Sequence, residues 1–179
     1  MDAKLSRWLW LFKWLLLIPH LIAVSVLTIV AVICKILAWF AILFTGKYPK
    51  SLFDMVVGVL RWQWRVNFYG YGALGTDKYP PFSMEAGNYP ADFTAAYPAS
   101  LNRVTTFFRL ILVIPHAIVL YVLMIVANVF LIVAALALLI TGKYPPGIFK
   151  TIMGVNRWMS RVNGYIYLLT DKYPPFSME

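Results

Sequence analysis

The chain is poor in charged residues and has almost no cysteine. Charged residues make up 13% of its 179 residues, whereas a soluble globular domain usually has about a quarter. Acidic residues are the scarcest: 7 Asp and Glu stand against 16 Lys and Arg, which gives a formal net charge of +9. The single cysteine, Cys34, excludes an intrachain disulfide, and we interpret it as a small apolar core residue. With 61% hydrophobic residues, this composition argues against a soluble domain.

The chain also lacks the residue combinations of common active sites. It contains no nucleophile beside a base, no carboxylate dyad, no glycine-rich phosphate loop and no characteristic spacing of metal ligands. We therefore expect a protein that is not an enzyme and that holds no cofactor. Its basic residues flank apolar segments instead of forming a basic domain, so nucleic acid is not an expected partner.

Two long apolar runs dominate the chain. Residues 8–44 contain only two charges, Lys13 and Lys35, and residues 110–141 contain none. An uncharged run well beyond about 18 residues is typical of a membrane segment. Because positive residues beside such segments usually mark the cytoplasmic side, we expect a multi-pass membrane protein whose termini are both cytoplasmic.

The sequence is a tandem repeat. The segment Thr76–Glu85 (TDKYPPFSME) returns unchanged as Thr170–Glu179, and earlier shared words recur at a constant offset of 96. We divide the chain into a first repeat unit (1–85), a linker rich in Pro and Ala (86–100) and a second unit (101–179).

Each unit is predicted to combine membrane-embedded helices with an amphipathic helix, which gives an all-α fold of two pseudo-symmetric repeats. Over residues 148–169, Arg157 and Arg161 lie on one polar helix face, opposite an apolar face rich in aromatic residues. Arg61 and Arg65 take the same places in the first unit. Such a helix is typical of the membrane interface.

The long apolar runs leave two topologies open. Each spans 37 residues, 8–44 or 104–140, whereas a single crossing needs about 20. One topology is a hairpin of two short helices followed by a flat amphipathic helix. The other is a long span followed by a second span whose arginine stripe is buried against protein. Both keep the two similarly charged units in one orientation, about a pseudo-twofold axis along the membrane normal.

We favour the hairpin, with tips near residues 25–28 and 121–124. A break or kink is expected at Pro19 and at Pro115, because proline lacks the N–H that an interior helical position requires.

Several repeated words resemble a known family. Its motifs match Ile18-Pro19-His20, Thr45-Gly46-Lys47-Tyr48-Pro49, Arg61-Trp62 with Arg65-Val66, and Thr76 to Ser83, together with their second copies. They resemble a bacterial integral membrane-protein family catalogued as a domain of unknown function, present here as two tandem copies that cover nearly the whole chain. The resemblance implies a location in the bacterial inner (cytoplasmic) membrane. It implies no activity, substrate or catalytic residue.

The four arginines of the amphipathic helices are the main candidate binding residues. Arg61 and Arg65, like Arg157 and Arg161, are spaced i, i+4 and share one helix face. Guanidinium groups suit the phosphates of anionic lipid headgroups. The alternatives are simple snorkelling to the interface, or an ion or substrate path if these helices span the membrane.

Other candidates are weaker. Asp54 and Lys150 are also candidate lipid- or partner-binding residues. They occupy matched positions with opposite charge, so they could pair about the pseudo-twofold axis or remain separately solvated. His20 and His116 are the only histidines; they could ligate a haem iron axially, or each could bond a carbonyl freed by the neighbouring proline. Lys35 is the only charge deep in an apolar run. It is either a functional charge within the membrane, or its long side chain reaches the membrane surface or a partner subunit.

These observations predict a non-catalytic small membrane protein. We expect a scaffold or accessory subunit that engages anionic lipid headgroups, other membrane-protein subunits or further copies of itself. The alternatives are an oligomeric channel or transporter around the arginine stripes, and a protein that generates membrane curvature through paired hairpins.

Overall fold

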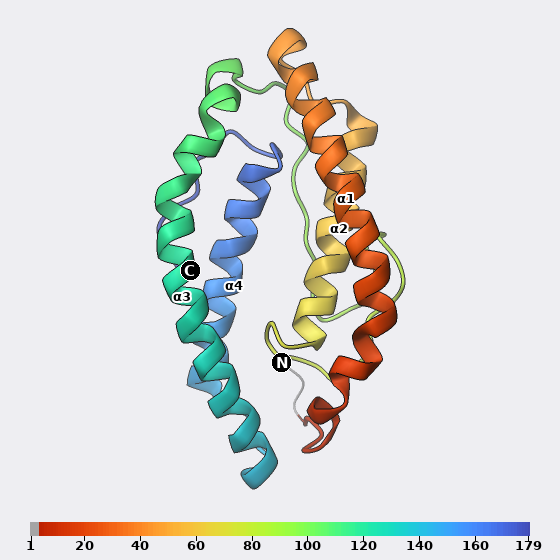
Figure 1. Ribbon diagram of the computed structural model, residues 1–179, viewed down its shortest axis with the longest axis vertical. Helices are drawn as coiled ribbons and strands as arrows, with labels where there is room; N and C mark the ends of the chain where they lie inside the picture. Colours follow the sequence, from red (N-terminus) through yellow and green to blue (C-terminus); the bar gives the residue numbers. More distant parts are fainter. Residues whose placement is uncertain (1–3) are drawn as a thin grey trace.

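The computed structural model describes residues 4–179, and these fold into two pairs of α-helices (Figure 1). The first pair is α1 (Lys13–Thr45) and α2 (Lys50–Tyr69), preceded by a short 3-10 helix, η1 (Leu9–Leu11). The second pair is α3 (Arg103–Thr141) and α4 (Pro146–Ile166). The all-helical fold and its two similar halves are therefore confirmed.

Each pair turns at the repeated Thr-Gly-Lys-Tyr-Pro word. Gly46 and Gly142 have φ of 73° and 70°, a left-handed conformation that glycine adopts without a side-chain clash. Each glycine closes the preceding helix by donating its N–H to a carbonyl four residues earlier. The extended residues Pro49 and Pro145 then lead into the next helix.

The predicted hairpins within the long apolar runs are wrong. α1 and α3 are continuous through residues 25–28 and 121–124, which contain neither of the strongest turn formers, Gly and Pro. Pro19 and Pro115 lie inside the helices and not at a break. We attribute this continuity to packing, because the neighbouring histidines are fully buried against the second helix of each pair.

α1 and α3 run antiparallel (Figure 1). The end of α1 meets the start of α3, where Leu101 donates its N–H to the Gly46 carbonyl at 2.8 Å and Trp39 donates to the Thr106 carbonyl at 3.2 Å. The two units are therefore related by a pseudo-twofold axis perpendicular to the helices. Such an axis coincides with a membrane normal only if the helices lie in the membrane plane.

Two tyrosines join the units in a reciprocal way. The Tyr48 hydroxyl donates to the Tyr167 carbonyl at 3.3 Å, and the Tyr144 hydroxyl donates to the Ala73 carbonyl at 2.9 Å. Burial raises the pKa of both hydroxyls, so they stay protonated donors throughout the physiological range. The buried core also crosses between the units, since Leu168 packs with residues of α1 and α2. The repeats form one body.

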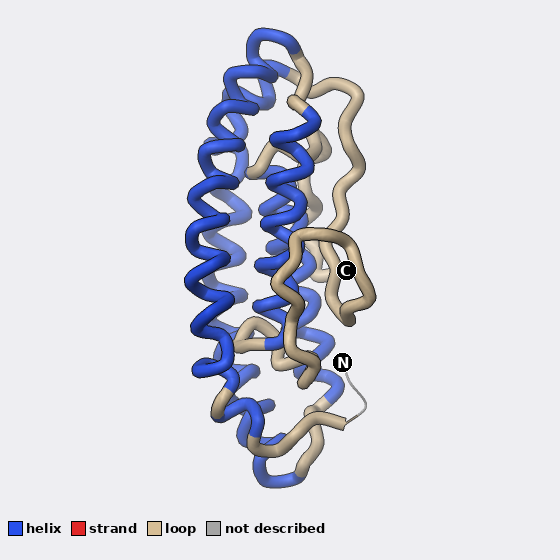
Figure 2. The backbone as a smooth tube through the Cα atoms, turned by 90° about the vertical axis from the view of Figure 1, so that its right-hand side faces the viewer, coloured by secondary structure: helices blue, strands red, loops and turns tan. Residues whose placement is uncertain are grey.

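The helices form two layers (Figure 2). One layer holds α1 and α3, and the other holds α2 and α4. The linker and the residues after α4 cover the second layer on the side away from the first. Large apolar side chains that are exposed on the four α-helices all belong to α1 or α3; examples are Ile22 at 64% and Ile140 at 75%. α1 and α3 are each long and apolar enough to cross a membrane.

The continuity of α1 can be tested with proline in its middle. Val26 is 57% exposed, so Val26→Ala should change stability little, whereas Val26→Pro should cost about 3 kcal/mol or more by breaking the helix. The measurement is unfolding in mild detergent, by heat or by titration with SDS. Equal stability of the two variants would contradict a continuous helix here.

Candidate functional site

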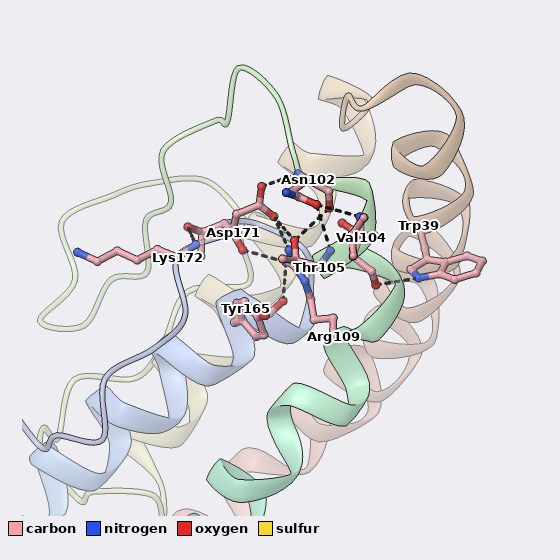
Figure 3. A network of polar contacts seen from close by, with 10 residues as sticks. Trp39, Asn102, Val104, Thr105, Arg109, Tyr165, Asp171 and Lys172 are labelled. Carbon is pink, nitrogen blue, oxygen red and sulfur yellow. Dashed lines mark hydrogen bonds and ion pairs between the residues drawn. The ribbon is translucent and has the colours of Figure 1, made fainter.

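In each unit a buried cation of the long helix binds the final segment of that unit, which is Thr76–Glu85 in the first unit and Thr170–Glu179 in the second. Lys13 and Arg109 occupy matched positions and are only 1% and 2% exposed. The Lys13 ammonium lies 3.1 Å from Asp77, and the Arg109 guanidinium lies 2.5 Å from Asp171. Each cation also donates to the carbonyl of the threonine before that aspartate, at 2.6 and 2.8 Å. Figure 3 shows the second of these networks, in which Arg109 also donates to the Tyr165 carbonyl.

The same aspartates also accept hydrogen bonds from the main chain at the start of each unit. Asp77 accepts from the Ser6 N–H, and Asp171 accepts from the Asn102 N–H at 2.6 Å. Sequence analysis missed these networks because it treated Lys13 only as an interruption of an apolar run. The signal was present: a basic residue recurs at the constant offset of 96, and the aspartate recurs unchanged within the repeated TDKYPPFSME segment.

The two histidines are built into separate and matching aromatic clusters. His20 is fully buried, its Nδ1 accepts from the Trp62 indole N–H at 3.0 Å, and its ring stacks on Phe82 with centroids 3.8 Å apart. The second unit repeats this arrangement at 3.1 and 3.9 Å with His116, Trp158 and Phe176. The repeated Ile-Pro-His, Arg-Trp and Pro-Pro-Phe words thus meet at one place in each unit.

This arrangement does not support axial haem ligation. His20 and His116 pack within different units, and over residues 4–179 no group of three or more His, Cys, Asp or Glu could hold a metal ion. The helix break expected beside each histidine is absent, and the observed bond is to an indole. Each imidazole is a packing residue of its own helix pair.

In both units the arginine stripe, which is Arg61 and Arg65 on α2 or Arg157 and Arg161 on α4, binds the end of the final segment. Arg65 is 1% exposed and donates to the Glu85 carbonyl at 2.8 Å and to the Ser83 carbonyl at 3.3 Å. Arg61 donates to the Met84 carbonyl at 2.8 Å. The segment lies close to α2 because Gly58 leaves room: a Cβ there would be 2.9 Å from the Cβ of Met84.

The second unit repeats this contact pattern on α4. Arg157 donates to the Met178 carbonyl at 3.3 Å, and Arg161 donates to the carbonyls of Ser177 and Glu179. Gly154 gives the same close approach as its counterpart on α2. The arginines of both stripes are therefore bound first of all to backbone carbonyls of their own unit.

The two stripes differ in their acidic partner. Asp92 of the linker lies 2.8 Å from Arg61 and 3.6 Å from Arg65, so its carboxylate compensates part of the charge of the first stripe. In the second unit no ion pair joins Arg157 or Arg161 to a carboxylate within the described part of the chain. Arg157 is exposed, and the buried Nε of Arg161 has no hydrogen-bond partner.

Arg157 and Arg161 line a groove of about 950 Å³. Arg157 and Arg161 form part of one wall on α4, and residues of α2, the linker and the final segment of the second unit form the others. The remaining charged lining residues are Asp92 and Lys172, so positive charge prevails. This groove is the candidate binding site.

The remaining candidates lie elsewhere. Asp54 pairs with Lys50, one turn earlier on α2 and well exposed, and not with Lys150, for which no ion pair is found among residues 4–179. Lys35 extends from α1 toward the second unit, where its ammonium lies 5.5 Å from the centroid of the Tyr167 ring. Of the two alternatives for these matched charges, pairing across the axis is not observed.

These features define a class: an all-helical tandem-repeat protein with two long apolar helices and two amphipathic helices whose arginines hold their own final segments. Residues 7–84 and residues 103–178 each match the family described as Domain of unknown function (DUF4389). The chain belongs to this family as two tandem copies, which confirms the resemblance found in the sequence. Neither a curated protein nor a solved structure matches the chain.

The buried cations predict a large effect from one conservative substitution. Asp171→Asn leaves the buried Arg109 without its counter-charge and should cost about 3 kcal/mol in unfolding free energy. The matched control is Asp54→Asn, whose ion pair is exposed and should contribute less than about 1 kcal/mol. Unfolding of both variants in mild detergent measures the difference. Similar losses in the two variants would show that the buried pair has no special weight.

Proposed function

We propose that the protein is a non-catalytic membrane scaffold that lies along one face of a bilayer. The outward faces of α1 and α3 are immersed in the lipid, and α2, α4 and the linker face the water. The observation that carries the proposal is the distribution of exposed apolar side chains, since α2 and α4 contribute no large ones. A broad apolar face opposite a polar one favours a membrane or protein contact.

The path of the linker favours helices in the membrane plane. Gly70 packs near Leu17 at one end of α1, whereas Leu101 bonds Gly46 at the other end, so residues 70–102 extend along the whole helix pair (Figure 2). That part of α1 is roughly 44 Å long at about 1.5 Å per residue, more than the hydrocarbon thickness of about 30 Å. If α1 crossed the bilayer, this non-helical backbone would cross as well, and lipid does not tolerate exposed irregular backbone.

The same placement fits the charges. With the helices in the membrane plane, the pseudo-twofold axis runs along the membrane normal. The matched basic residues of both units then face the same side of the bilayer, in keeping with the tendency of positive residues to stay on the cytoplasmic side.

On the water-facing side, the open groove suits an acidic partner. Among residues 4–179 no Asp or Glu side chain pairs with Arg157 or Arg161, whereas the equivalent residues Arg61 and Arg65 bind Asp92. Asp92 thus indicates the chemistry that the second stripe would accept, because guanidinium groups form strong paired hydrogen bonds with carboxylates. The partner proposed here is an acidic segment of another subunit of a membrane complex.

The orientation predicts a labelling pattern. In a Cys34→Ser background, single cysteines at Ser51 and Asn67, at opposite ends of α2, should both react with a membrane-impermeant thiol reagent from one side of a membrane vesicle. A cysteine at Ile22, on the exposed face of α1, should react only after detergent is added. Reaction of Ser51→Cys and Asn67→Cys from opposite sides would show that the helices cross the bilayer and would overturn the proposal.

The groove predicts binding of an acidic ligand that depends on salt. A fluorescent Asp- and Glu-rich peptide should bind the purified protein, and Arg157→Gln should weaken binding about tenfold through the loss of one charge-assisted contact. The control, Lys50→Gln, removes an exposed cation that does not line the groove and should leave binding unchanged. No binding, or equal weakening by both variants, would count against a partner at this groove.

A second candidate is an oligomeric channel or transporter, which the length and apolar character of α1 and α3 favour. In such an assembly the polar faces of several copies would surround the ion path. Labelling from opposite sides, together with ion flux in liposomes that is lost in Arg157→Ala with Arg161→Ala, would support this candidate.

A further inference from the structure

A second cavity lies between the two units, where the last third of α1 meets the first turns of α3 and the end of α4. Its volume is about 300 Å³. Its apolar lining includes Ile36, Phe40 and Leu110, which are 48%, 50% and 69% exposed. Because exposed residues of the apolar layer form this rim, the cavity opens onto the face that we place in the bilayer.

The polar lining of the cavity consists of groups that can donate hydrogen bonds. Thr106 and Arg109 are 1% and 2% exposed, and both line the cavity. The Oγ1 of Thr106 and the Nε of Arg109 are buried and bond to nothing over residues 4–179. The other nitrogens of Arg109 are held by Asp171 and two carbonyls, as Figure 3 shows, so its Nε–H is fixed in place. A buried donor without a partner is costly, and a bound acceptor would remove that cost.

Lys35 supplies the charge. Its ammonium has an aromatic neighbour at 5.5 Å but no carboxylate within ion-pair distance in the described chain, and no acidic residue lines the cavity. Arg109, in contrast, is already paired with Asp171. The cavity is therefore lined by one lysine without an ion-pair partner in the described chain and by two residues that each carry an unbonded donor, beneath an apolar rim.

We propose that this cavity binds the anionic head of one amphiphilic lipid. Lys35 is the counter-ion of its phosphate or carboxylate, and the Arg109 Nε–H and the Thr106 hydroxyl donate to its oxygens. The acyl chain lies along the rim formed by Ile36, Phe40 and Leu110. The volume suits a small headgroup with its first methylenes, and the remainder of the lipid stays in the bilayer. The inference rests on the proposed placement of this face in lipid.

The pseudo-twofold axis provides an internal comparison. At the equivalent place between the units, Leu131 stands where Lys35 stands here, and Lys13 takes the place of Arg109. Leu131 is 7% exposed and packs with Ala135 in the core there. The charge that would hold an anion is missing from that side, so the proposal is one lipid for each chain and not two.

Native mass spectrometry of the purified full chain in mild detergent tests the proposal. Titration with phosphatidylglycerol, oleate and zwitterionic phosphatidylcholine should show one retained anionic lipid per chain and little retained phosphatidylcholine. Retention of phosphatidylglycerol alone, of oleate alone, or of both would identify the source of the anionic head. Equal retention of phosphatidylcholine, or two anionic lipids per chain with equal affinity, would overturn the proposal.

The key variant is Lys35→Leu, which copies the second unit. It should weaken the affinity for the anionic lipid about tenfold, through the loss of one charge-assisted contact. The matched control, Lys50→Leu, removes an exposed lysine outside the cavity and should leave the affinity unchanged; thermal unfolding of both variants checks that they fold. Equal affinities in the two variants would refute the role of Lys35.

The proposed lipid site and the proposed orientation in the membrane would be refuted by different results. Because lipid retention is measured in detergent, it does not depend on how the helices lie in a bilayer. Labelling of α2 from opposite sides with one lipid retained would reject the orientation and keep the lipid site. Labelling from one side with no selective retention would do the reverse.

Discussion

A single carboxylate at the beginning of each final segment holds the unit together. Asp77 and Asp171 each compensate a buried cation on the long helix and accept an N–H from the start of the unit. Without this carboxylate the buried cation would destabilise the unit by about 3 kcal/mol, because it would be an unpaired charge in the interior. From that point the segment runs back over the amphipathic helix, where it covers the histidine cluster and supplies carbonyls to the arginines. Loss of the carboxylate would therefore loosen every layer of the unit.

Local features of the sequence were sufficient to predict part of the local structure. The glycine in Thr-Gly-Lys-Tyr-Pro could have marked the turn, because glycine readily takes the left-handed conformation that closes the helix there, but the turns were predicted elsewhere. The stripe with Arg157 and Arg161 marks the amphipathic helix, because residues four apart share a face. Membership in the family followed from words that survive in both copies.

Long-range pairing could not be predicted in the same way. Lys13 meets an aspartate 64 positions later in the chain, and no periodicity links the two. The hairpin prediction failed because it assumed that the long runs cross a bilayer and must be divided to fit its thickness. Helices that pack along their whole length against a partner obey no such limit, and Pro19 is accommodated within one of them.

The contacts between the units are reciprocal. Tyr48, just after α1, donates a hydrogen bond to a carbonyl of the second unit, and Tyr144, just after α3, donates one to a carbonyl of the first. Reciprocity of this kind belongs to the interface of a symmetric dimer, in which each surface recognises its own copy. Joining the two halves through the linker frees them from the requirement to stay identical. The first unit has Lys35 where the second has Leu131. The linker supplies Asp92 to the arginine stripe of the first unit, whereas the stripe of the second unit lines the open groove. The two linked units thus resemble a heterodimer whose two subunits share one fold and lie within a single polypeptide.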